Sequence, residues 1–331
     1  MMDITVLVME GAFTSGITVT LDVLTVAEGL AKKACATAPR WRVCSLEGGP
    51  IRLANGILVE TTKLTLDKQT EQSLLVIPGL NLRTPNDIHA RLNQPDARKI
   101  QKLLVRHAAQ GGRIAVTCSA VFLLQDAGLL KDKRVTTTWW LGPVLQKLEP
   151  ECRVDADRMI CVDGAITTAG AAFAQMDLML HLLREHTSPR LAELVSKVLL
   201  IDGREAQSSF MVPEVWSSGN NLISRLSEKV QASLPEVLDV GSLAREFCMS
   251  ERTLSRHVHK ATGKTTVALI QSVRLRHARR LLESSRLTVE QVALAVGYQD
   301  ATSLRKAMRS RIGVNPSRFR PGVAVRAPAS A

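Results

Sequence analysis

The stretch from Thr288 to Arg320 reads TVEQVALAVGYQDATSLRKAMRSRIGVNPSRFR and predicts two short helices about a tight turn. Thr288 and Gln291 have the spacing of a capping box, in which each side chain satisfies a free amide at a helix start. Gly297 would end that helix, and Asp300 would cap a second one. The apolar residues expected on the buried face of the second helix are Leu304, Ala307, Met308 and Ile312. Such a pair of helices is a helix-turn-helix.

The outward face of this second helix is basic. It would carry Thr302, Arg305, Lys306 and Arg309. A helix in a major groove presents such side chains to base edges and phosphates. The alternative is a solvated basic face on an ordinary helical hairpin, since this geometry also occurs outside DNA-binding proteins. A second copy of the pattern favours the DNA-binding interpretation.

This other copy, the first along the chain, runs from Asp239 to Gly263. Asp239 and Ser250 would cap its two helices, and Gly263 would close the second one as Gly313 closes its counterpart. Between the copies, residues Thr266 to Ser284 predict one continuous helix. Its apolar side would carry Ile270, Val273, Ala278 and Leu281. Four arginines are expected largely outside that side, namely Arg274, Arg276, Arg279 and Arg280.

Residues of the connecting helix and of the copy at 288–320 resemble the double helix-turn-helix domain of AraC-type transcription regulators. The matching residues are Arg274, Ala278, Leu281, Leu282, Val292, Ala293, Gly297, Tyr298, Gly313, Pro316 and Arg320. The sequence departs from the pattern at Leu304 and Met308, where many members carry aromatic residues. By match to the family, the DNA contacts would be Arg252, Ser255 and Arg256 in the first copy and Thr302, Arg305 and Lys306 in the second. The resemblance also implies recruitment of RNA polymerase.

Charge divides the chain into two parts. The 331 residues carry a net charge of +12. Residues 1–240 contain 26 basic and 26 acidic side chains, whereas residues 241–331 contain 17 basic and 5 acidic ones. The excess therefore lies in the segment with the repeated pattern, as binding to DNA phosphates requires.

Cysteine spacing and hydropathy exclude several other classes. The six cysteines form no C-x-x-C pair and have no histidine at metal-ligand spacing, so we expect no disulfide framework, no zinc site and no cofactor. The apolar start of the chain lacks a basic segment and is too short for a signal peptide. Residues 164–183 contain Gln175 and Asp177, which favour a buried helix over a membrane span. A cytoplasmic protein is expected.

Residues 1–204 alternate between short apolar runs and amphipathic segments. Strands are expected at 4–9, 42–46, 73–77 and 113–117, and helices at 18–32, 95–110 and 121–129. This alternation predicts a parallel sheet covered by helices on both faces. The predicted fold class is therefore α/β, a flavodoxin-like sandwich with a parallel sheet, followed by an all-α double helix-turn-helix domain.

One turn of the α/β part has the residues for chemistry. The strand at 113–117 leads directly to Cys118, and Ser119 and Ala120 open the next helix. A side chain on such a turn is expected to be exposed above the sheet, with helix amides available to hold an anion. A thiol at a helix start can have a lowered pKa. Cys118 is thus placed like a nucleophile, but no histidine follows at a recognisable position to act as its base.

Several segments around this turn resemble the PfpI-like domain of the class I glutamine-amidotransferase-like fold. They are Cys118 to Ala120, Gly128 to Leu130, Arg134 to Trp139, Thr168 to Gly170, Asp177, Leu180 and His181. Such a domain before an AraC-type domain is similar to the GlxA group of regulators. In catalytic relatives a histidine commonly precedes the tryptophan, where this sequence has Thr138. The loop from Phe13 to Gly16, near which some relatives have an acidic partner for the cysteine, holds no carboxylate.

Three interpretations of Cys118 remain open: a catalytic nucleophile, a small residue at a strained turn, and part of a binding pocket. The two departures disfavour hydrolase, amidase or hydratase activity. A pocket above the carboxyl ends of the strands is favoured, because open α/β sheets bind ligands there. Its expected residues are Phe13, Gly16, Leu80, Cys118, Ser119, Thr138 and Trp139. The family resemblance implies a small, often nitrogen-containing metabolite.

The expected organisation is an α/β sensor domain at 1–204, a linker at 205–220, a DNA-binding domain at 221–321 and a disordered tail at 322–331. Together these predict a transcription regulator, an activator by family resemblance, that binds double-stranded DNA as a homodimer, without a membrane partner. One rival is a cysteine-dependent enzyme that carries a DNA-binding module. Another is an architectural protein that binds DNA without sequence preference.

Overall fold

The computed structural model describes residues 3–65, 73–201, 204, 206–207, 221–312 and 315–320. The chain divides into two compact units, Met1–Gln207 and Ser208–Ala331.

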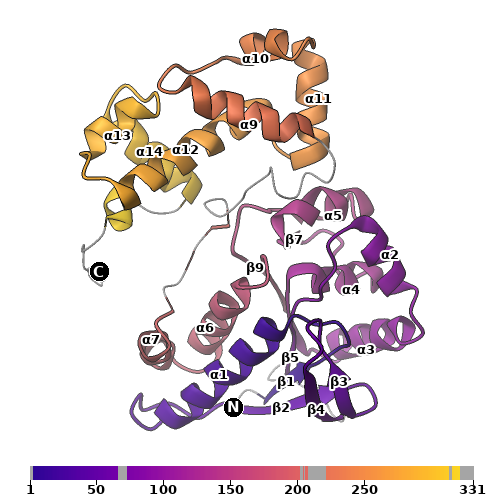
Figure 1. Ribbon diagram of the computed structural model, residues 1–331. Helices are drawn as coiled ribbons and strands as arrows, with labels where there is room; N and C mark the ends of the chain where they lie inside the picture. The colour runs from indigo at the N-terminus through magenta and orange to yellow at the C-terminus, as the bar shows by residue number, and fades with distance from the viewer. Residues whose placement is uncertain are drawn as a thin grey trace. The chain divides into compact units, whose positions relative to one another are not determined.

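The N-terminal unit is built on an eight-stranded, mostly parallel sheet (Figure 1). Its strands are β1 (Asp3–Leu7), β2 (Arg40–Ser45), β3 (Gly49–Arg52), β4 (Leu58–Lys63), β5 (Ser73–Ile77), β6 (Arg113–Thr117), β9 (Ile160–Asp163) and β10 (Ile166–Ala169). Their order across the sheet is β3-β4-β2-β1-β5-β6-β10-β9. The strands from β4 to β10 in this order pair in parallel, whereas β3 and β9 add antiparallel edges. A separate parallel pair is formed by β7 (Arg134–Val135) and β8 (Arg153–Val154).

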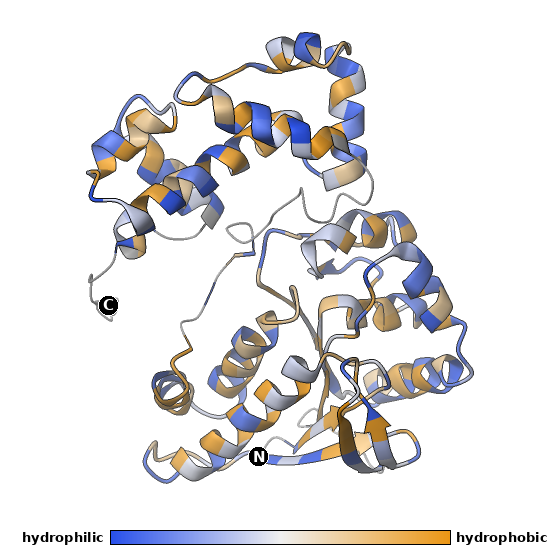
Figure 2. Cartoon of the chain, in the orientation of Figure 1, coloured by the Kyte–Doolittle hydropathy of each residue, from blue (hydrophilic) through white to orange (hydrophobic). Residues whose placement is uncertain are grey.

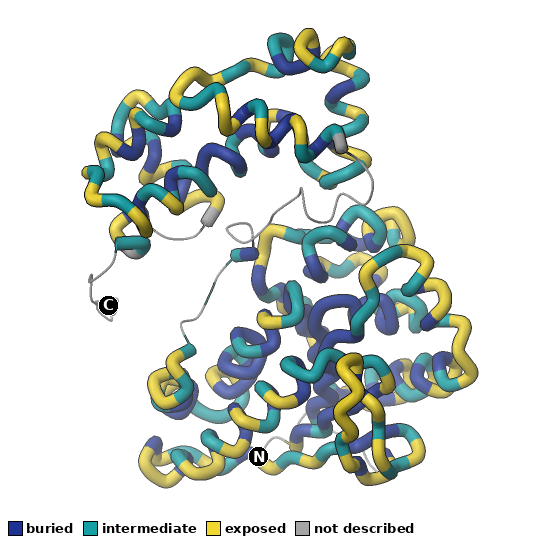
Figure 3. Tube along the Cα trace, viewed as in Figure 1, coloured by how far each residue is buried: buried dark blue, intermediate teal, exposed yellow. Residues whose placement is uncertain are grey.

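Helices cover both faces of this sheet, which confirms the predicted α/β sandwich. One group of mutually packed helices is α1 (Thr14–Leu30), α6 (Ala174–His186) and α7 (Pro189–Val198). The other is α2 (Pro85–Leu92), α3 (Ala97–Ala109), α4 (Val121–Asp126) and α5 (Gly142–Leu148) (Figure 1). Because both faces are covered, the central strands β5 and β6 are buried along almost their whole length (Figure 3).

Most predicted elements of this unit are present, some with shifted ends. The strands predicted at 73–77 and 113–117 have those bounds. The first helix begins at Thr14 instead of residue 18, and α4 ends at Asp126 instead of residue 129, where Gly128 adopts a positive φ of 67°. The sequence missed β3 and β4. β3 is the edge strand and β4 lies next to it. Both carry exposed residues, Leu58 among them, so they lack the apolar run by which buried strands are recognised.

The C-terminal unit is helical. It contains α9 (Asn221–Ser233), α10 (Val240–Glu246), α11 (Glu251–Thr262), α12 (Thr266–Ser284), α13 (Val289–Ala295), α14 (Ala301–Ile312) and a 3₁₀ turn, η4 (Pro316–Phe319). The predicted caps are confirmed, because Asp239, Ser250 and Asp300 each accept a hydrogen bond from an amide of the following first turn. Thr288 and Gln291 form both bonds of the predicted capping box.

The helix α12 belongs to two small cores. Its N-terminal half packs with α9, α10 and α11 through Leu269, Ile270 and Val273. Its C-terminal half packs with α13 and α14 through Ala278 and Leu282, among others. Figure 2 shows hydrophilic and hydrophobic residues along each of these helices, as two-sided packing of short amphipathic helices requires. The prediction of one continuous helix at 266–284 is confirmed.

One arginine of α12 departs from the prediction. Arg274 does not lie on the outer side, because only 8% of its surface is exposed. Its Nε donates to the carbonyl of Val296 at 2.9 Å and its Nη2 donates to that of Gly297 at 2.7 Å. The guanidinium also lies 4.1 Å from the centre of the Tyr298 ring. Arg274 thus satisfies carbonyls at the end of α13. These hydrogen bonds compensate for the burial of its charged guanidinium.

The segment between the units is described only in part. Ala206 and Gln207, which the sequence assigns to the linker, contact the N-terminal unit, since Ala206 forms an antiparallel bridge with Arg158. The remainder of the predicted linker from 208 to 220, Gly313 and the predicted tail lie outside the described residues. No helix in the described part of the chain is both long and apolar enough to span a membrane.

Candidate nucleic-acid interface and ligand site

The first set of predicted DNA contacts lies on α11. Arg252 and Arg256 are exposed, whereas Leu254 and Val258 on the opposite side are buried. Ser255 is half-buried, and its Oγ lies 3.3 Å from the Oγ1 of Thr266 at the start of α12. The two arginines are therefore free of the core, while the serine is shared between α11 and α12.

The second set lies on α14. Thr302, Arg305 and Lys306 are exposed, and Leu304 and Met308 are fully buried behind them. The two apolar residues that depart from the family's aromatic pattern therefore still fill the core, as expected. Each recognition-type helix thus has one face held in a core and an opposite face that carries cationic donors, which can contact phosphates and guanine edges.

The turn at Cys118 has the geometry of a strained elbow. Cys118 adopts a positive φ of 56°, which is uncommon for a residue with a Cβ. Its amide donates to the carbonyl of Gly170 at 2.8 Å, and its carbonyl accepts from Thr137 Oγ1 at 2.8 Å. A Cβ at Gly79 would lie 2.6 Å from the Cys118 Cβ, so a glycine is needed there. The elbow is therefore fixed from three neighbouring loops.

The structure corrects the expected exposure and pKa of Cys118. The residue is only 1% exposed, although the sequence suggested a side chain open to solvent above the sheet. Burial raises the pKa of its thiol to about 11, although contacts from Ser119, Thr138 and the Ala172 amide act in the opposite direction. Desolvation of the thiolate thus raises the pKa by more than the position at a helix start lowers it. No histidine is among the described groups that shift this pKa.

The residues predicted to form the ligand pocket are partly brought together. Ser119 Oγ donates to the Leu80 carbonyl at 2.5 Å, and the Phe13 amide donates to Gly79 at 2.8 Å. A Cβ at Gly16 would lie 3.2 Å from Pro78. Leu80, Cys118, Ser119 and Thr138 are all buried. Phe13 and Trp139 are half-buried, so part of the cluster reaches the surface while its centre at Cys118 is buried.

Thr138 and Trp139 follow the short strand β7. Thr138 Oγ1 is fully buried and has no hydrogen-bond partner of normal geometry, although it is close enough to the Cys118 thiol to favour the thiolate. Trp139 is half-buried and packs edge-on against Trp140, with ring centres 5.4 Å apart. The hydroxyl of Thr138 is thus the polar atom of the cluster whose bonding is least satisfied.

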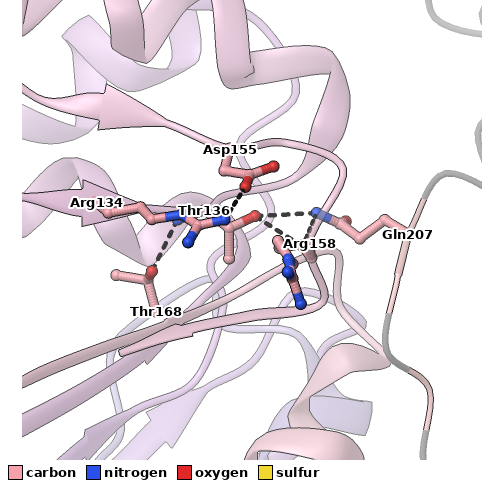
Figure 4. A network of polar contacts seen from close by, with 6 residues as sticks. All are labelled: Arg134, Thr136, Asp155, Arg158, Thr168 and Gln207. Carbon is pink, nitrogen blue, oxygen red and sulfur yellow. Dashed lines mark hydrogen bonds and ion pairs between the residues drawn. The ribbon is translucent and has the colours of Figure 1, made fainter. Parts of the chain in front are cut away.

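Sequence reasoning missed the polar contacts that surround this cluster. Figure 4 shows Gln207 reaching Thr136, which in turn lies beside Thr168 and Arg158. On the other side, Gln175 accepts from Thr117 Oγ1 at 2.6 Å and donates to Thr20 Oγ1 at 2.8 Å. A glutamine in an otherwise apolar pattern is only a weak sequence signal of a buried polar network, because its hydrogen-bond partners are distant in the sequence.

Comparisons with known proteins agree with this architecture. The DJ-1/PfpI family model matches residues 2–185, more than half of the chain. The chain belongs to the DJ-1/PfpI family. A helix-turn-helix domain model matches residues 243–322, which include the second capped helix pair and most of the first. The family member described here therefore combines a PfpI-like N-terminal unit with a C-terminal DNA-binding unit.

Curated relatives are similar over nearly the same span. The transcriptional regulator CdhR of Pseudomonas aeruginosa is 26% identical over 298 residues, which cover 88% of this chain and 84% of CdhR. The transcriptional regulator GlxA of Rhizobium meliloti is 26% identical over 276 residues, which cover 82% of both chains. Together with the two family matches, they show an AraC-type, DNA-binding transcription regulator with a PfpI-like N-terminal unit.

A solved structure supports the fold of the N-terminal unit. It is a THiJ/PfpI family protein from Pseudomonas syringae, with a TM-score of 0.52 and 17% identity. The match covers 68% of this chain and 86% of that protein.

Proposed function

We propose that this regulator recognises specific double-stranded DNA through two helices and senses a small metabolite in its N-terminal unit. The DNA contacts are Arg252, Ser255 and Arg256 on α11 and Thr302, Arg305 and Lys306 on α14. The supporting observation is that each of these helices is the second of a capped pair and carries exposed cations opposite a buried face. Two such helices would read successive major-groove segments about 34 Å apart.

The proposed ligand site is the cluster around Cys118, with Phe13, Gly16, Leu80, Ser119, Thr138 and Trp139. Its buried, unsatisfied hydroxyl at Thr138 supports binding of a polar ligand. The family resemblance points to a nitrogen-containing metabolite. Because the centre of the cluster is buried, the ligand would bind a state in which the surrounding loops open, and its effect would arise from different affinities for the two states.

The proposed assembly is a homodimer that recruits RNA polymerase and activates transcription. Residues 1–204 form the sensor domain, 205–220 the linker, 221–321 the DNA-binding domain and 322–331 a tail in this proposal. The cytoplasm is the proposed compartment.

A cysteine-dependent enzyme is the second candidate, because DJ-1/PfpI relatives include enzymes. A high thiol pKa opposes it, since the thiolate is the nucleophile and little forms near neutral pH. We therefore propose a non-catalytic sensor without a resident cofactor. Cys118→Ala separates the two: an enzyme loses turnover, whereas the sensor keeps its DNA binding.

The deciding experiment selects binding sites for the full-length protein from a random DNA library at physiological salt. We expect a recurring site of two short half-motifs about one helical turn apart. Arg256→Ala and Lys306→Ala should each weaken binding to it by about fivefold or more, equal to the loss of one base or phosphate contact of about 1 kcal/mol. If the selected sequences share no motif, the result would support an architectural protein that binds DNA without sequence preference.

Two matched variants control for the charge change. Arg190→Ala on α7 and Lys102→Ala on α3 each remove one exposed cation from the N-terminal unit. They should bind the selected site like the wild-type protein. Equal effects of control and test variants would contradict the contact assignment.

A further inference from the structure

The side chain of Gln207, at the end of the N-terminal unit, fills a polar cradle. It is only 2% exposed. Its Nε2 lies 3.2 Å from Thr136 Oγ1 (Figure 4) and 2.9 Å from the Thr137 carbonyl. The carbonyls of Ala156 and Arg158 lie at 3.0 Å from the same nitrogen. Four oxygens thus surround an amide nitrogen with only two hydrogens.

The other end of the carboxamide is also bound. Gln207 Oε1 accepts from the Ala171 amide at 2.9 Å. A Cβ at Gly170 would lie 2.2 Å from Gln207 Cδ, so the glycine leaves the space that the carboxamide occupies. We call this site the carboxamide cradle, formed by Thr136, Thr137, Ala156, Arg158, Gly170 and Ala171. One donor facing the oxygen and several acceptors facing the nitrogen match a primary amide.

The loops of the cradle are the loops that hold Cys118. Thr137 accepts from Gln207 through its carbonyl and donates to the Cys118 carbonyl through its hydroxyl. Gly170 accepts from the Cys118 amide and packs against the Gln207 side chain. Removal of the carboxamide would therefore loosen two of the loops that fix the Cys118 elbow.

Gln207 also fastens the chain that leads to the DNA-binding unit. Its amide donates to the Asp157 carbonyl at 2.8 Å, and Ala206 bridges to Arg158. Three residues earlier, Arg204 forms an ion pair of 2.6 Å with the buried Asp177. Past Gln207 the compact N-terminal unit ends. The side chain therefore lies between the candidate ligand site and the start of the connection.

We propose that the carboxamide of Gln207 is an internal ligand of the cradle, and that a small molecule with a primary carboxamide displaces it as the regulatory step. Displacement releases Gln207 and the connecting chain, while the carboxamide of the ligand takes over the contacts that hold the loops at Cys118. This inference rests on the proposed sensor function and specifies the regulation of that site. A carboxylate is excluded from the cradle, because it lacks the N–H donors and would face carbonyl oxygens.

The first test uses Gln207→Ala in the full-length protein, with acetamide as the probe. The emptied cradle should raise the alkylation rate of Cys118 about tenfold, because several hydrogen bonds that hold the loops are lost. Acetamide, which has the terminal group of glutamine, should restore the slow rate, and equal concentrations of acetate should not. Gln110→Ala, at an exposed glutamine next to α3, is the matched control and should alkylate like the wild-type protein.

A second variant reaches the same state without changing Gln207. Gly170→Ala fills the cradle with a methyl group and expels the flexible glutamine side chain. It should raise Cys118 alkylation as much as Gln207→Ala, and the double variant should add little, as expected for two changes that remove one interaction. Acetamide should not rescue it, because the methyl group occupies the site. If the alanine variant does not fold, Gln207→Glu tests the same loss, because a carboxylate is excluded from the cradle.

Unchanged Cys118 reactivity in these variants, or equal rescue by acetate, would overturn the cradle as a carboxamide site. Operator affinity tests the regulatory step: Gln207→Ala and Gly170→Ala should shift it about fivefold or more in the same direction. Altered reactivity with unaltered operator affinity would overturn the regulatory step. If the wild-type protein selects no operator, the proposed function fails, while the acetamide result still decides the cradle.

Discussion

Cys118 shows how burial decides the chemistry of a single residue. With its pKa raised to about 11, the thiol should stay unmodified by iodoacetamide at pH 7.5, while the exposed Cys35 and Cys248 react. Its rate should then rise about tenfold per pH unit up to about pH 11, because only the thiolate attacks. Peptide mass spectrometry after timed alkylation measures each cysteine separately. Equal modification of Cys118 and the exposed cysteines at pH 7.5 would contradict the shift.

The same pKa sets the sign of a stability effect. The folded state keeps the Cys118 proton between about pH 9 and 11, where the unfolded chain loses it. Folding stability should therefore be unaffected below pH 9 and should fall as pH rises through this range, by up to about 3 kcal/mol. Urea unfolding of the wild-type protein and of Cys118→Ser across this range checks the sign, since the serine variant lacks this contribution. A loss that is the same in both would assign it to Cys152 and Cys161, whose pKa values are also raised to about 11 by burial.

For a single residue, the sequence predicts the local turn in which it lies but not whether it is exposed to solvent. The strand-to-helix turn at Cys118 was predictable from the apolar run that ends at Thr117, and the positive φ fits such a turn. Its burial was not predictable, because it depends on Gly79 and Gly170, which lie in the loops after two other strands. The contacts of Gln207 arise in the same way, from loops 36 to 71 residues away.

Among the elements, α12 joins the two helix pairs, and Arg274 ties it to the second pair. Arg274→Met should destabilise the core of α12, α13 and α14 by about 2–4 kcal/mol, because two carbonyls lose a charged donor in a buried site. Hydrogen exchange should rise in α13 and α14 and change little in α10 and α11, whose core does not include this contact.

Arg280→Met on the same helix is the matched control. Arg280 is exposed and contacts His277 on its own helix, so its loss should leave exchange in α13 unchanged. Uniform loosening of both cores by Arg274→Met would show that the two cores unfold as one.

Element ends followed from local chemistry where caps were present. The starts at Asp239, Ser250 and Thr288 agree with the sequence, because an N-cap acts within three residues of itself. The edge strand β3, its neighbour β4 and the inward side of Arg274 were missed. The two strands form a hairpin without an apolar run, and the carbonyls that Arg274 bonds are 22 and 23 residues away, which periodicity does not report.

For the whole molecule, the division of charge makes a prediction about salt. All of the +12 excess lies in residues 241–331, while residues 1–240 are neutral. The C-terminal unit alone should therefore neutralise DNA phosphates and release their counterions. The slope of log affinity against log salt measures the number of phosphates that are neutralised, at about −0.9 for each.

Lys306→Ala should make this slope shallower by about 0.9, because an exposed cation of α14 is lost. Lys102→Ala removes an equal charge from α3, within the neutral segment 1–240, and should leave the slope unchanged. Titrations of the selected operator between 50 and 200 mM salt compare the three proteins, in the range where such contacts dominate affinity. If Lys102→Ala flattened the slope as much as Lys306→Ala, phosphate binding would extend to the N-terminal unit. The charge division would then no longer mark where the protein meets DNA.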